Sequence, residues 1–473
     1  MAISEIDSLQ DKKVHFIGVG GISMSALAAM HLKSGGEVTG SDIKAGERLE
    51  WIRELGGAVK CGHSPENIKD QDLVVVSSAI PEDNIELQKA RKMNKKVISR
   101  AEFLAKLTAD NSLIAVTGTH GKTTTTAMLT EIFLQAERDP SVMIGGELNG
   151  ISGNHLQGRG DYFLIEADES DGSLINYNPW LGIITNMEEE HLDFYEDSSK
   201  LIKTMVEFSR RIRNDGHIIL CSDDPVIKTS LLPVLREIED LTIHSYGINS
   251  GDYQAERIEI DGFKSSYSFI TPEGERYEID VNSPGRHNVL NSLAAVISAR
   301  IAGIGWQNII TALGEFSGVK RRFEEKGSVN DIRVIDDYAH HPSEILATYH
   351  TADKARNSRI VTVFQPHRFT RTAALWDQFA DVLSRIDNLW LCDIYPANQE
   401  AIPGVNSRDL VRDIRQFSGS CNTGVKYAGD IQSAFKKLRN FVEPGDLVLT
   451  LGAGDVYKVG EWLLSSLREN DCE

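Results

Sequence analysis

The chain has 473 residues, and this length predicts about three domains. Hydrophobic residues make up 41% and charged residues 25%, as in an ordinary globular protein, and the formal net charge is −19. Such a negative charge argues against nucleic acid as a partner, and an anionic substrate would need local positive sites.

The cysteines and the apolar runs exclude further classes. The five cysteines are scattered and form no C-x-x-C pair, so neither a disulfide framework nor a thiolate zinc site is expected. The first residues lack the basic and apolar regions of a signal peptide, and no apolar run approaches the roughly 20 residues of a membrane span. We therefore expect a cytoplasmic protein without a membrane partner.

Short apolar runs alternate with helical periodicity along the whole chain, which predicts an α/β fold in three blocks. The first block is expected at residues 1–108. Its pattern predicts strands at Val14–Val19, Glu37–Ser41 and Leu73–Ser77, and a helix at Ile22–Leu32.

A glycine loop follows the first predicted strand. Gly18, Gly20 and Gly21 suggest the dinucleotide fingerprint G-x-G-x-x-G, but its third position is Ser23. Asp42 follows at about the separation expected for a ribose contact. The loop can cradle a diphosphate through its backbone, and a nicotinamide-dependent dehydrogenase would explain it equally well.

The second block is expected at residues 109–318. A strand is predicted at Leu113–Val116 and a helix at Lys122–Gln135. Further strands are predicted at Tyr162–Glu166, Leu181–Thr185 and His217–Cys221. From about Asp252 to Val281, polar and apolar residues alternate as in an antiparallel sheet.

A second glycine loop lies between that strand and that helix. Gly118-Thr-His-Gly121-Lys122-Thr123 can turn backbone N–H groups and a helix N-terminus toward a phosphate, with Lys122 reaching the terminal phosphates and Thr123 binding Mg²⁺. The usual G-x-x-x-x-G-K-[ST] spacing is not met, because its first glycine would fall at Val116. The alternative is a glycine turn with a surface lysine.

Candidate metal ligands follow the next two strands, as a magnesium site requires. Glu169 comes shortly after the strand that ends at Glu166, and His191 follows the strand that ends near Thr185. Adjacent parallel strands can bring Glu169 and His191 to one metal. The alternatives are a solvated loop carboxylate and an ordinary loop histidine. Two phosphate loops together imply two nucleotides in two domains, which a dehydrogenase does not need.

The third block is expected at residues 319–473. Strands are predicted at Arg333–Ile335, Ile360–Phe364, Leu389–Asp393 and Asp446–Leu451, with helical stretches between them.

Motifs in all three blocks occur in the order found in Mur ligases, and the chain resembles this family over essentially its whole length. The motifs are Gly18-x-Gly-Gly, Gly-Thr-His-Gly-Lys-Thr, Glu166-Ala-Asp-Glu-Ser-Asp, His191-Leu-Asp193, Gly285-Arg-His-Asn288 with Asn291, Asp336-Asp-Tyr-Ala-His-His-Pro342 and Gln365-Pro-His-Arg-Phe-Thr-Arg371. The last two are far more specific than either glycine loop.

The resemblance implies a fold and a reaction. It implies a Rossmann-like UDP-binding domain, a central P-loop ATPase-like domain and a Rossmann-like amino-acid-binding domain. The expected reaction uses ATP and Mg²⁺ to phosphorylate the lactyl carboxylate of UDP-N-acetylmuramate, and L-alanine then attacks the acyl phosphate. A monomer or a weak homodimer is expected.

The matching motifs also imply residue roles. The expected ATP contacts are Gly118, Thr119, His120, Gly121, Lys122, Thr123, Thr124, His287, Asn288 and Asn291. The expected UDP-sugar contacts are Gly18, Gly20, Gly21, Ser41, Asp42, His63, Asn67 and Ser78. The expected amino-acid and acyl-phosphate site has Tyr338, His341, Arg368 and Arg371, with Lys122, His341, Arg368 and Arg371 as catalytic residues. The expected metal ligands are Thr123, Glu169 and His191.

Several alternatives stay open at this point. Asn288 and Asn291 would also suit helix capping or a buried polar contact, and Arg368 and Arg371 a solvated basic stretch. His341 is either a base for the incoming ammonium or an orienting hydrogen-bond partner. A close alternative function is that of the family member that ligates a murein tripeptide to the same sugar nucleotide. A dehydrogenase and a non-enzymatic nucleotide sensor are more distant alternatives.

Overall fold

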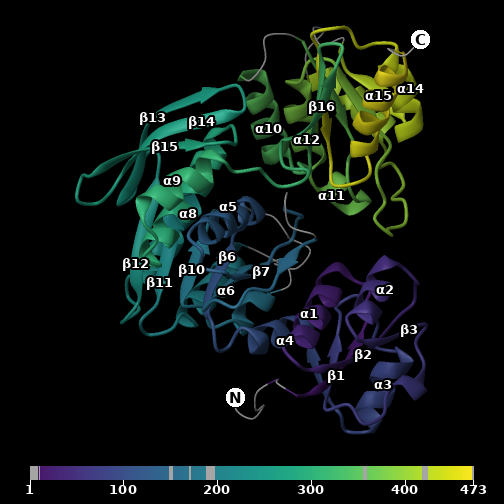
Figure 1. Cartoon of the computed structure of the whole chain (residues 1–473). Helices are drawn as coiled ribbons and strands as arrows, with labels where there is room; N and C mark the ends of the chain where they lie inside the picture. Colours follow the sequence, from purple (N-terminus) through teal and green to yellow (C-terminus); the bar gives the residue numbers. More distant parts are fainter. Residues whose placement is uncertain are drawn as a thin grey trace. The chain divides into compact units, whose positions relative to one another are not determined.

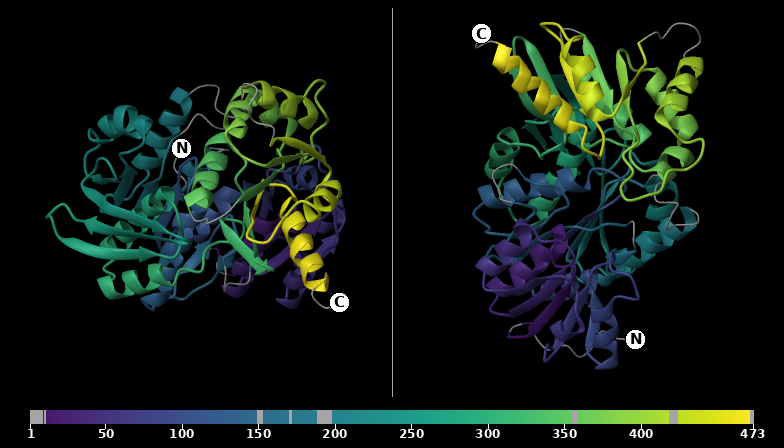
Figure 2. Two further views of the ribbon diagram at one scale, coloured as in Figure 1. Left: turned by 90° about the horizontal axis from the view of Figure 1, so that it is seen from above. Right: turned by 90° about the vertical axis from the view of Figure 1, so that its right-hand side faces the viewer.

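The computed structural model describes residues 9, 11–148, 153–169, 172–187, 198–354, 359–417 and 424–470. In this part of the chain the strands form three sheets, of five, ten and six strands. Figures 1 and 2 show helices packed along these sheets, so the predicted α/β class is confirmed. None of the described helices has the length and apolar character that a membrane crossing requires.

The first sheet is parallel and has the order β3-β2-β1-β4-β5. Its strands are β1 (Lys13–Ile17), β2 (Glu37–Asp42), β3 (Ala58–Cys61), β4 (Leu73–Val76) and β5 (Lys96–Ser99). The accompanying helices are α1 (Ile22–Lys33), α2 (Glu47–Glu54), the 3-10 turn η1 (Pro65–Asn67), α3 (Ile85–Lys92) and α4 (Arg100–Leu107). The strand order reverses beside β1, and ligands of such sheets bind outside the carboxyl ends of the strands at that reversal.

The first sheet corrects two details of the prediction. Strand β1 ends at Ile17 rather than at Val19, because Gly18 turns the chain with a φ of +83°. The edge strands β3 and β5 were not predicted, since each has a single buried residue, Val59 and Ile98.

The second sheet places β6 between β9 and β10, in the order β15-β14-β13-β12-β11-β10-β6-β9-β7-β8. Its strands are β6 (Ser112–Thr117), β7 (Ser141–Met143), β8 (His155–Leu156), β9 (Tyr162–Glu166), β10 (Leu181–Ile184), β11 (His217–Cys221), β12 (Thr242–Gly247), β13 (Tyr253–Asp261), β14 (Lys264–Ile270) and β15 (Arg276–Val281). Strands β9 and β10 both run parallel to β6, so the carboxyl ends of all three meet at one edge. The predicted antiparallel pairing is present between β14 and β15.

The helices of this region begin with α5, which starts directly after the second glycine loop. They are α5 (Lys122–Gln135), the 3-10 turn η2 (Ser173–Asn176), α6 (Ser198–Arg210), the π-helical turn η3 (Ile227–Leu231), α7 (Leu232–Leu235), α8 (Arg286–Ile301) and α9 (Trp306–Gly314). Helix α5 has the predicted bounds, and most of its side chains are buried.

The third sheet has the order β16-β17-β21-β18-β19-β20 and is parallel apart from β16. Its strands are β16 (Glu324–Val329), β17 (Ile332–Asp337), β18 (Ile360–Phe364), β19 (Leu389–Cys392), β20 (Lys426–Gly429) and β21 (Leu447–Leu451). Its helices are α10 (Pro342–Lys354), α11 (Phe369–Ala374), α12 (Trp376–Ser384), α13 (Ser407–Phe417), α14 (Ile431–Arg439) and α15 (Tyr457–Asn470).

Alternate residues of the third sheet enter two separate cores. Ile335 packs with residues of α10, α12 and α13, whereas its neighbour Val334 packs with residues of α14 and α15. This alternation follows from the two-residue period of a strand, and it explains why the strands are apolar on both faces.

The described chain forms two compact units. One contains the first sheet and β6–β12, and the other contains β14, β15, the first turns of α8 and the third sheet. The predicted domain limits at 108/109 and 318/319 stay predictions.

Candidate functional site

The second glycine loop joins β6 to α5 in a conformation that needs glycine. Gly118 has a φ of +125° and Gly121 a φ of +82°, a backbone region that other residues rarely adopt. A Cβ atom at position 118 would also lie only 2.3 Å from Oγ1 of Thr185. The loop therefore packs directly against the segment that follows β10.

Asn186 stabilises this loop through hydrogen bonds of its side chain. Its Oδ1 accepts the backbone N–H of His120 at 2.8 Å, and its Nδ2 donates to the carbonyl of His120 at 3.0 Å. The hydroxyl of Thr185 donates to the same carbonyl at 2.6 Å. The sequence analysis did not assign Asn186, although its place at the carboxyl end of a strand adjacent to β6 was a usable signal.

Lys122 is a partly buried cation at the centre of the loop. Its ammonium donates to the carbonyls of Gly118 at 2.5 Å and Thr119 at 3.1 Å, and to the carboxylate of Glu169 at 3.0 Å. Burial by itself would lower the pKa of Lys122, but the carboxylates of Glu169, Glu166 and Asp168 outweigh it and raise that pKa. The lysine is therefore held charged at the position where a terminal phosphate is expected.

The carboxyl end of β9 brings hard oxygen ligands to the start of α5. Glu166 Oε2 accepts the hydroxyl of Thr123 at 2.9 Å and the backbone N–H of Gly145 at 2.8 Å. Thr123, Glu166 and Glu169 are the donor types that Mg²⁺ prefers, so the residues present fit a magnesium–triphosphate. His191 lies outside the described residues, and within them no group of three His, Cys, Asp or Glu side chains is placed to hold a metal.

Glu166 is a candidate that the sequence analysis missed as a ligand. It is the last residue of β9 and stands opposite Val116 of β6 in the sheet register. Because β6 leads into the second glycine loop, that register was the signal that could have identified Glu166.

The first glycine loop is tied to the end of β2. The backbone N–H of Gly20 donates to Oδ2 of Asp42 at 2.9 Å, and the N–H of Lys44 donates to Oδ1 at 3.1 Å. A Cβ at Gly20 would lie 2.9 Å from that carboxylate oxygen. In this structure Asp42 organises the loop, and its contact with a ribose stays a prediction.

The other residues expected at the UDP-sugar divide into two groups. Ser41 and Asn67 are buried, and both donate hydrogen bonds to the buried carboxylate of Glu86. His63 is partly exposed and Ser78 is exposed in the turn after β4. The sequence analysis did not single out Glu86.

The residues expected at adenine and ribose begin α8. The side-chain amide of Asn288 donates to Ser283 Oγ and to the carbonyl of Pro284, both at 2.8 Å, and Asn291 donates to Asn288 Oδ1 at 3.1 Å. Both asparagines are buried. Asn288 and Asn291 therefore make the buried polar contacts that were the alternative interpretation. Their contact with ATP stays a prediction.

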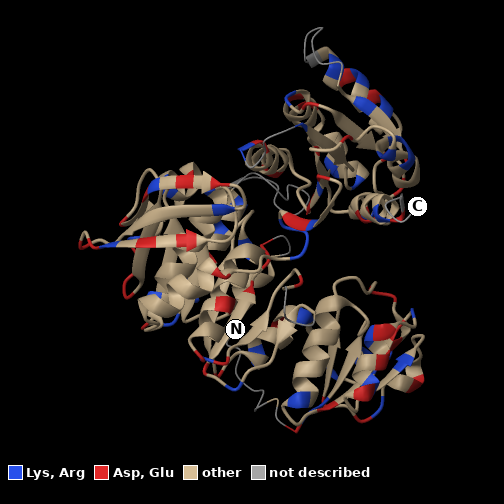
Figure 3. Cartoon of the chain, turned by 45° about the horizontal axis from the view of Figure 1, so that its top comes forward, with Lys and Arg blue, Asp and Glu red and all other residues tan. Residues whose placement is uncertain are grey.

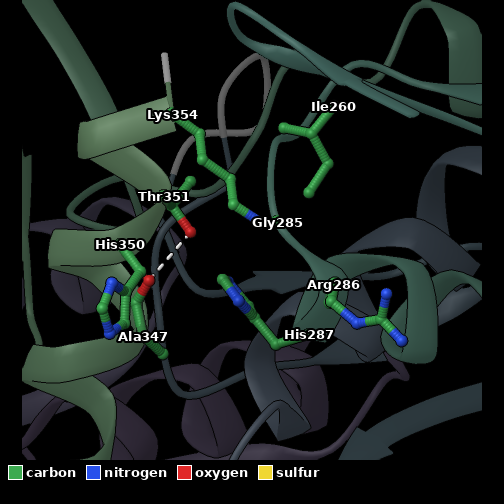
Figure 4. Close-up of a pocket in the computed structure, with 8 residues that line it drawn as sticks. All are labelled: Ile260, Gly285, Arg286, His287, Ala347, His350, Thr351 and Lys354. Carbon is green, nitrogen blue, oxygen red and sulfur yellow. Dashed lines mark hydrogen bonds between the residues drawn. The ribbon is translucent and has the colours of Figure 1, made fainter. Parts of the chain in front are cut away.

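His287 lines a pocket of about 190 Å³ in the second unit. Figure 4 shows Arg286 and His287 of α8 on one side and His350, Thr351 and Lys354 of α10 on the other, where Thr351 donates to the carbonyl of Ala347. The lining includes an arginine and a lysine, which suits an anionic ligand. Elsewhere Figure 3 shows acidic and basic positions interspersed over the chain.

Tyr338 and His341 lie where β17 leads into α10. His341 immediately precedes α10, is 7% exposed, and its Nδ1 lies 2.8 Å from the hydroxyl of Ser343. The guanidinium groups of Arg321 and Arg322 lie over the ring of Tyr338, at 5.1 and 5.2 Å from its centre.

Arg321 is another residue that the sequence analysis missed. Its guanidinium donates to Asp336 at 3.0 Å and to the carbonyls of Gly452 and Gly454, at 2.5 and 3.0 Å. It therefore joins the carboxyl ends of β17 and β21 beside Tyr338. Its two carbonyl partners are 131 and 133 residues away in the sequence, so no local pattern could indicate it.

Arg368 and Arg371 lie at the start of α11, after Pro366. Arg368 is exposed and directly precedes the helix, and Arg371 lies within it. Nearby, burial lowers the pKa of His367 to about 4, and the charges of Arg371, Arg368 and Arg321 contribute. Neutral histidine beside several cations makes this a positive site, suited to a carboxylate or a phosphoryl group.

Comparison with known proteins gives matches over nearly the whole chain. The description "Mur ligase family, catalytic domain" matches residues 13–112, "Mur ligase middle domain" matches 116–299, and "Mur ligase, glutamate ligase domain" matches 321–454. The UDP-N-acetylmuramate–L-alanine ligase of Clostridium perfringens is 43% identical over 97% of this chain and 99% of that protein. That of Syntrophobacter fumaroxidans is 42% identical over 97% and 96%.

Solved structures agree with these matches. The UDP-N-acetylmuramate–alanine ligase of Thermotoga maritima superposes with a TM-score of 0.78 and 28% identity, and covers 97% of this chain and 100% of that one. A murein peptide ligase of Psychrobacter arcticus gives a TM-score of 0.66 and 25% identity, with coverage of 96% and 98%.

Proposed function

Because the chain belongs to the Mur ligase family, we propose that it is an ATP-dependent ligase that joins L-alanine to the lactyl carboxylate of UDP-N-acetylmuramate. The reaction belongs to the synthesis of peptidoglycan precursors. Its main support is the agreement of full-length relatives of that name with a lysine-bearing phosphate loop and its carboxylates.

The chemistry requires that the sugar-borne carboxylate be activated, since a carboxylate is a poor electrophile. Transfer of the γ-phosphoryl group of ATP to one carboxylate oxygen gives an acyl phosphate and ADP. The alanine amine attacks the acyl carbon, and the C–O bond to the phosphate breaks, so that phosphate leaves with the bonding electrons. The protein contributes positioning and charge neutralisation.

The proposal gives each residue a role that the geometry of its site supports. Lys122 neutralises charge on the transferred phosphoryl group, and the backbone N–H groups of the loop at the start of α5 bind the phosphates. Bound Mg²⁺, held by Thr123 and Glu169 with His191, would add Lewis-acid stabilisation, and Glu166 orients Thr123.

In the second unit, Tyr338, Arg368 and Arg371 form the proposed site for the amino acid and the acyl phosphate. His341 is the proposed base for the alanine ammonium or the partner that orients it. A cytoplasmic location and a monomer or weak homodimer remain part of this proposal.

The test is phosphate release with UDP-N-acetylmuramate, ATP and Mg²⁺, comparing L-alanine, glycine, L-serine and the murein tripeptide as acceptors. Release that is fastest with L-alanine supports the proposal. Release with the tripeptide alone would identify the rival ligase, and ATP binding without release under any condition would favour a nucleotide sensor.

A further inference from the structure

Glu86 is a fully buried carboxylate in the first turn of α3 that collects hydrogen bonds from the first sheet and its loops. Its Oε1 accepts the side-chain amide of Asn67 at 2.6 Å and the backbone N–H of Ser64 at 3.0 Å. Its Oε2 accepts the hydroxyl of Ser41 and lies 3.4 Å from Nε2 of His15. An ionised carboxylate only accepts, so every partner must give a proton to it.

This requirement fixes the direction of the next hydrogen bond. Ser41 has one hydroxyl proton, and it donates that proton to Glu86. Nδ1 of His63 lies 2.8 Å from the Ser41 oxygen and 3.4 Å from Oε2 of Glu86. A bare nitrogen lone pair would be repelled by both oxygens, so in the neutral ring Nδ1 carries the proton and Nε2 is an acceptor.

His63 lies at the edge of the first sheet where a ligand is expected. His63 follows β3 and Ser41 lies near the end of β2, so both belong to the carboxyl-end edge that also carries the glycine loop after β1. The His63 side chain is 12% exposed, and no described residue makes a hydrogen bond with its Nε2.

We propose that Glu86 is a positioning residue that acts through Ser41 to fix His63 in the Nδ1–H tautomer, so that Nε2 accepts a hydrogen bond from the base of the bound nucleotide. This inference rests on the proposed function, which places the UDP group at this edge. A uracil base carries a donor at N3, whereas N3 of cytosine is an acceptor and would face the lone pair of Nε2. The network therefore selects uridine over cytidine nucleotides.

The Glu86→Gln substitution reverses the direction of the hydrogen bonds that run from His63 through Ser41 to residue 86. The amide oxygen must take the place of Oε1, because the backbone N–H of Ser64 can only donate. The amide NH₂ then faces Ser41, which accepts from it and turns its own proton toward His63. The substitution moves the ring proton of His63 from Nδ1 to Nε2, which becomes a donor.

The first test is the tautomer of His63 in the ligand-free full chain. A long-range ¹H–¹⁵N spectrum of the histidine rings is recorded above neutral pH, and His63 is assigned by its absence in His63→Gln. A protonated Nδ1 and an unprotonated Nε2 support the proposal, and the opposite pattern in the wild-type protein overturns it. This test does not depend on whether any variant of Glu86 folds.

The second test is nucleotide preference, measured by calorimetric titration with UDP and with CDP. We expect the wild-type protein to prefer UDP, and Glu86→Gln to reduce the UDP-to-CDP preference by about tenfold, the equivalent of one hydrogen bond. The matched control is Glu82→Gln, whose carboxylate is 80% exposed beside Arg91 and should leave the preference unchanged.

The outcomes separate the two proposals. If neither UDP nor CDP binds while the free protein has the predicted tautomer, the proposed function fails. The role of Glu86 in fixing the tautomer of His63 is then still supported. If UDP binds and Glu86→Gln inverts the tautomer of His63 without changing the preference for UDP over CDP, the proposed hydrogen bond between His63 and the base is refuted. The proposed function is then unaffected.

Discussion

Lys122 is partly buried and Glu86 is fully buried, and the groups that surround these two charges differ. Lys122 meets two backbone carbonyls and one carboxylate, and its side chain is 12% exposed. Glu86 is fully buried, and protein donors surround both of its oxygens. The first arrangement can exchange a partner for a ligand, whereas the second fixes the orientation of its neighbours.

Lys122→Met is expected to lower kcat for phosphate release by at least about 100-fold, because a preorganised charge on the transferred phosphoryl group is lost. The measurement is steady-state phosphate release at saturating substrates. UDP binding by the first sheet should be retained, which serves as the folding control. Activity within threefold of wild type would remove Lys122 from the proposed chemistry.

Glu86 should make folding stability depend on acidity. Burial alone would raise its pKa, but hydrogen bonds from His15, Ser41, Ser64 and Asn67 lower it from 4.5 to about 2. Because the folded-state pKa is the lower one, this stabilisation is complete above pH 4.5 and is lost as the pH falls toward 2. Its size is about 3 kcal/mol.

Urea unfolding at several pH values tests this expectation. The difference in unfolding free energy between wild type and Glu86→Gln should be largest near neutral pH and should shrink below pH 4.5. Glu47→Gln, an exposed change on α2, is the control. A difference that stays constant down to pH 2.5 would contradict the expectation.

At the scale of elements, the longest apolar runs gave accurate bounds and the short edge strands did not. The predicted bounds of α5, β9 and β11 agree with the structure, because each has a continuous buried pattern. Strands β3 and β20 were not predicted, since each has a single buried residue and depends on its neighbour in the sheet for pairing.

Close packing between α15 and the third sheet depends on a glycine within the helix. A Cβ at Gly460 would lie 2.7 Å from Cγ1 of Val334 on β17. Gly460→Ala should therefore destabilise the protein by about 1–3 kcal/mol through overpacking. Thermal or urea unfolding measures the change.

Gly314, the last residue of α9, provides the matched control. A Cβ there meets nothing within 4 Å, so Gly314→Ala should be neutral or stabilise by up to about 1 kcal/mol through helix propensity. Equal effects of the two substitutions would show that the contact with Val334 does not limit packing.

At the scale of the whole molecule, the residues proposed for one reaction belong to two compact units. Lys122 and Glu169 lie in the first, and His287, His341 and Arg371 lie in the second. The acyl phosphate must be protected from water while three substrates meet, so the proposed reaction requires the units to close around them.

Small-angle scattering should detect this closure. The radius of gyration should decrease when the protein is saturated with UDP-N-acetylmuramate and a non-hydrolysable ATP analogue with Mg²⁺. UDP alone, which contacts only the first sheet in the proposed scheme, is the control and should cause little change. Identical scattering of the free and the fully saturated protein would count against closure.

The sequence by itself determined the α/β class, the family and the position of the second glycine loop, because each is specified by residues adjacent in the chain. Apolar runs specify the strands, glycine the left-handed turns, and lysine and threonine the start of the helix. Only the tertiary structure revealed that Asn186 supports the loop, that Arg321 joins β17 to β21, and that Glu86 lies behind Ser41 and His63. These partners are 66, 131 and 45 residues apart for Asn186–His120, Arg321–Gly452 and Glu86–Ser41. Buried polar groups must find a partner, but which partner is available depends on how the strands and helices pack.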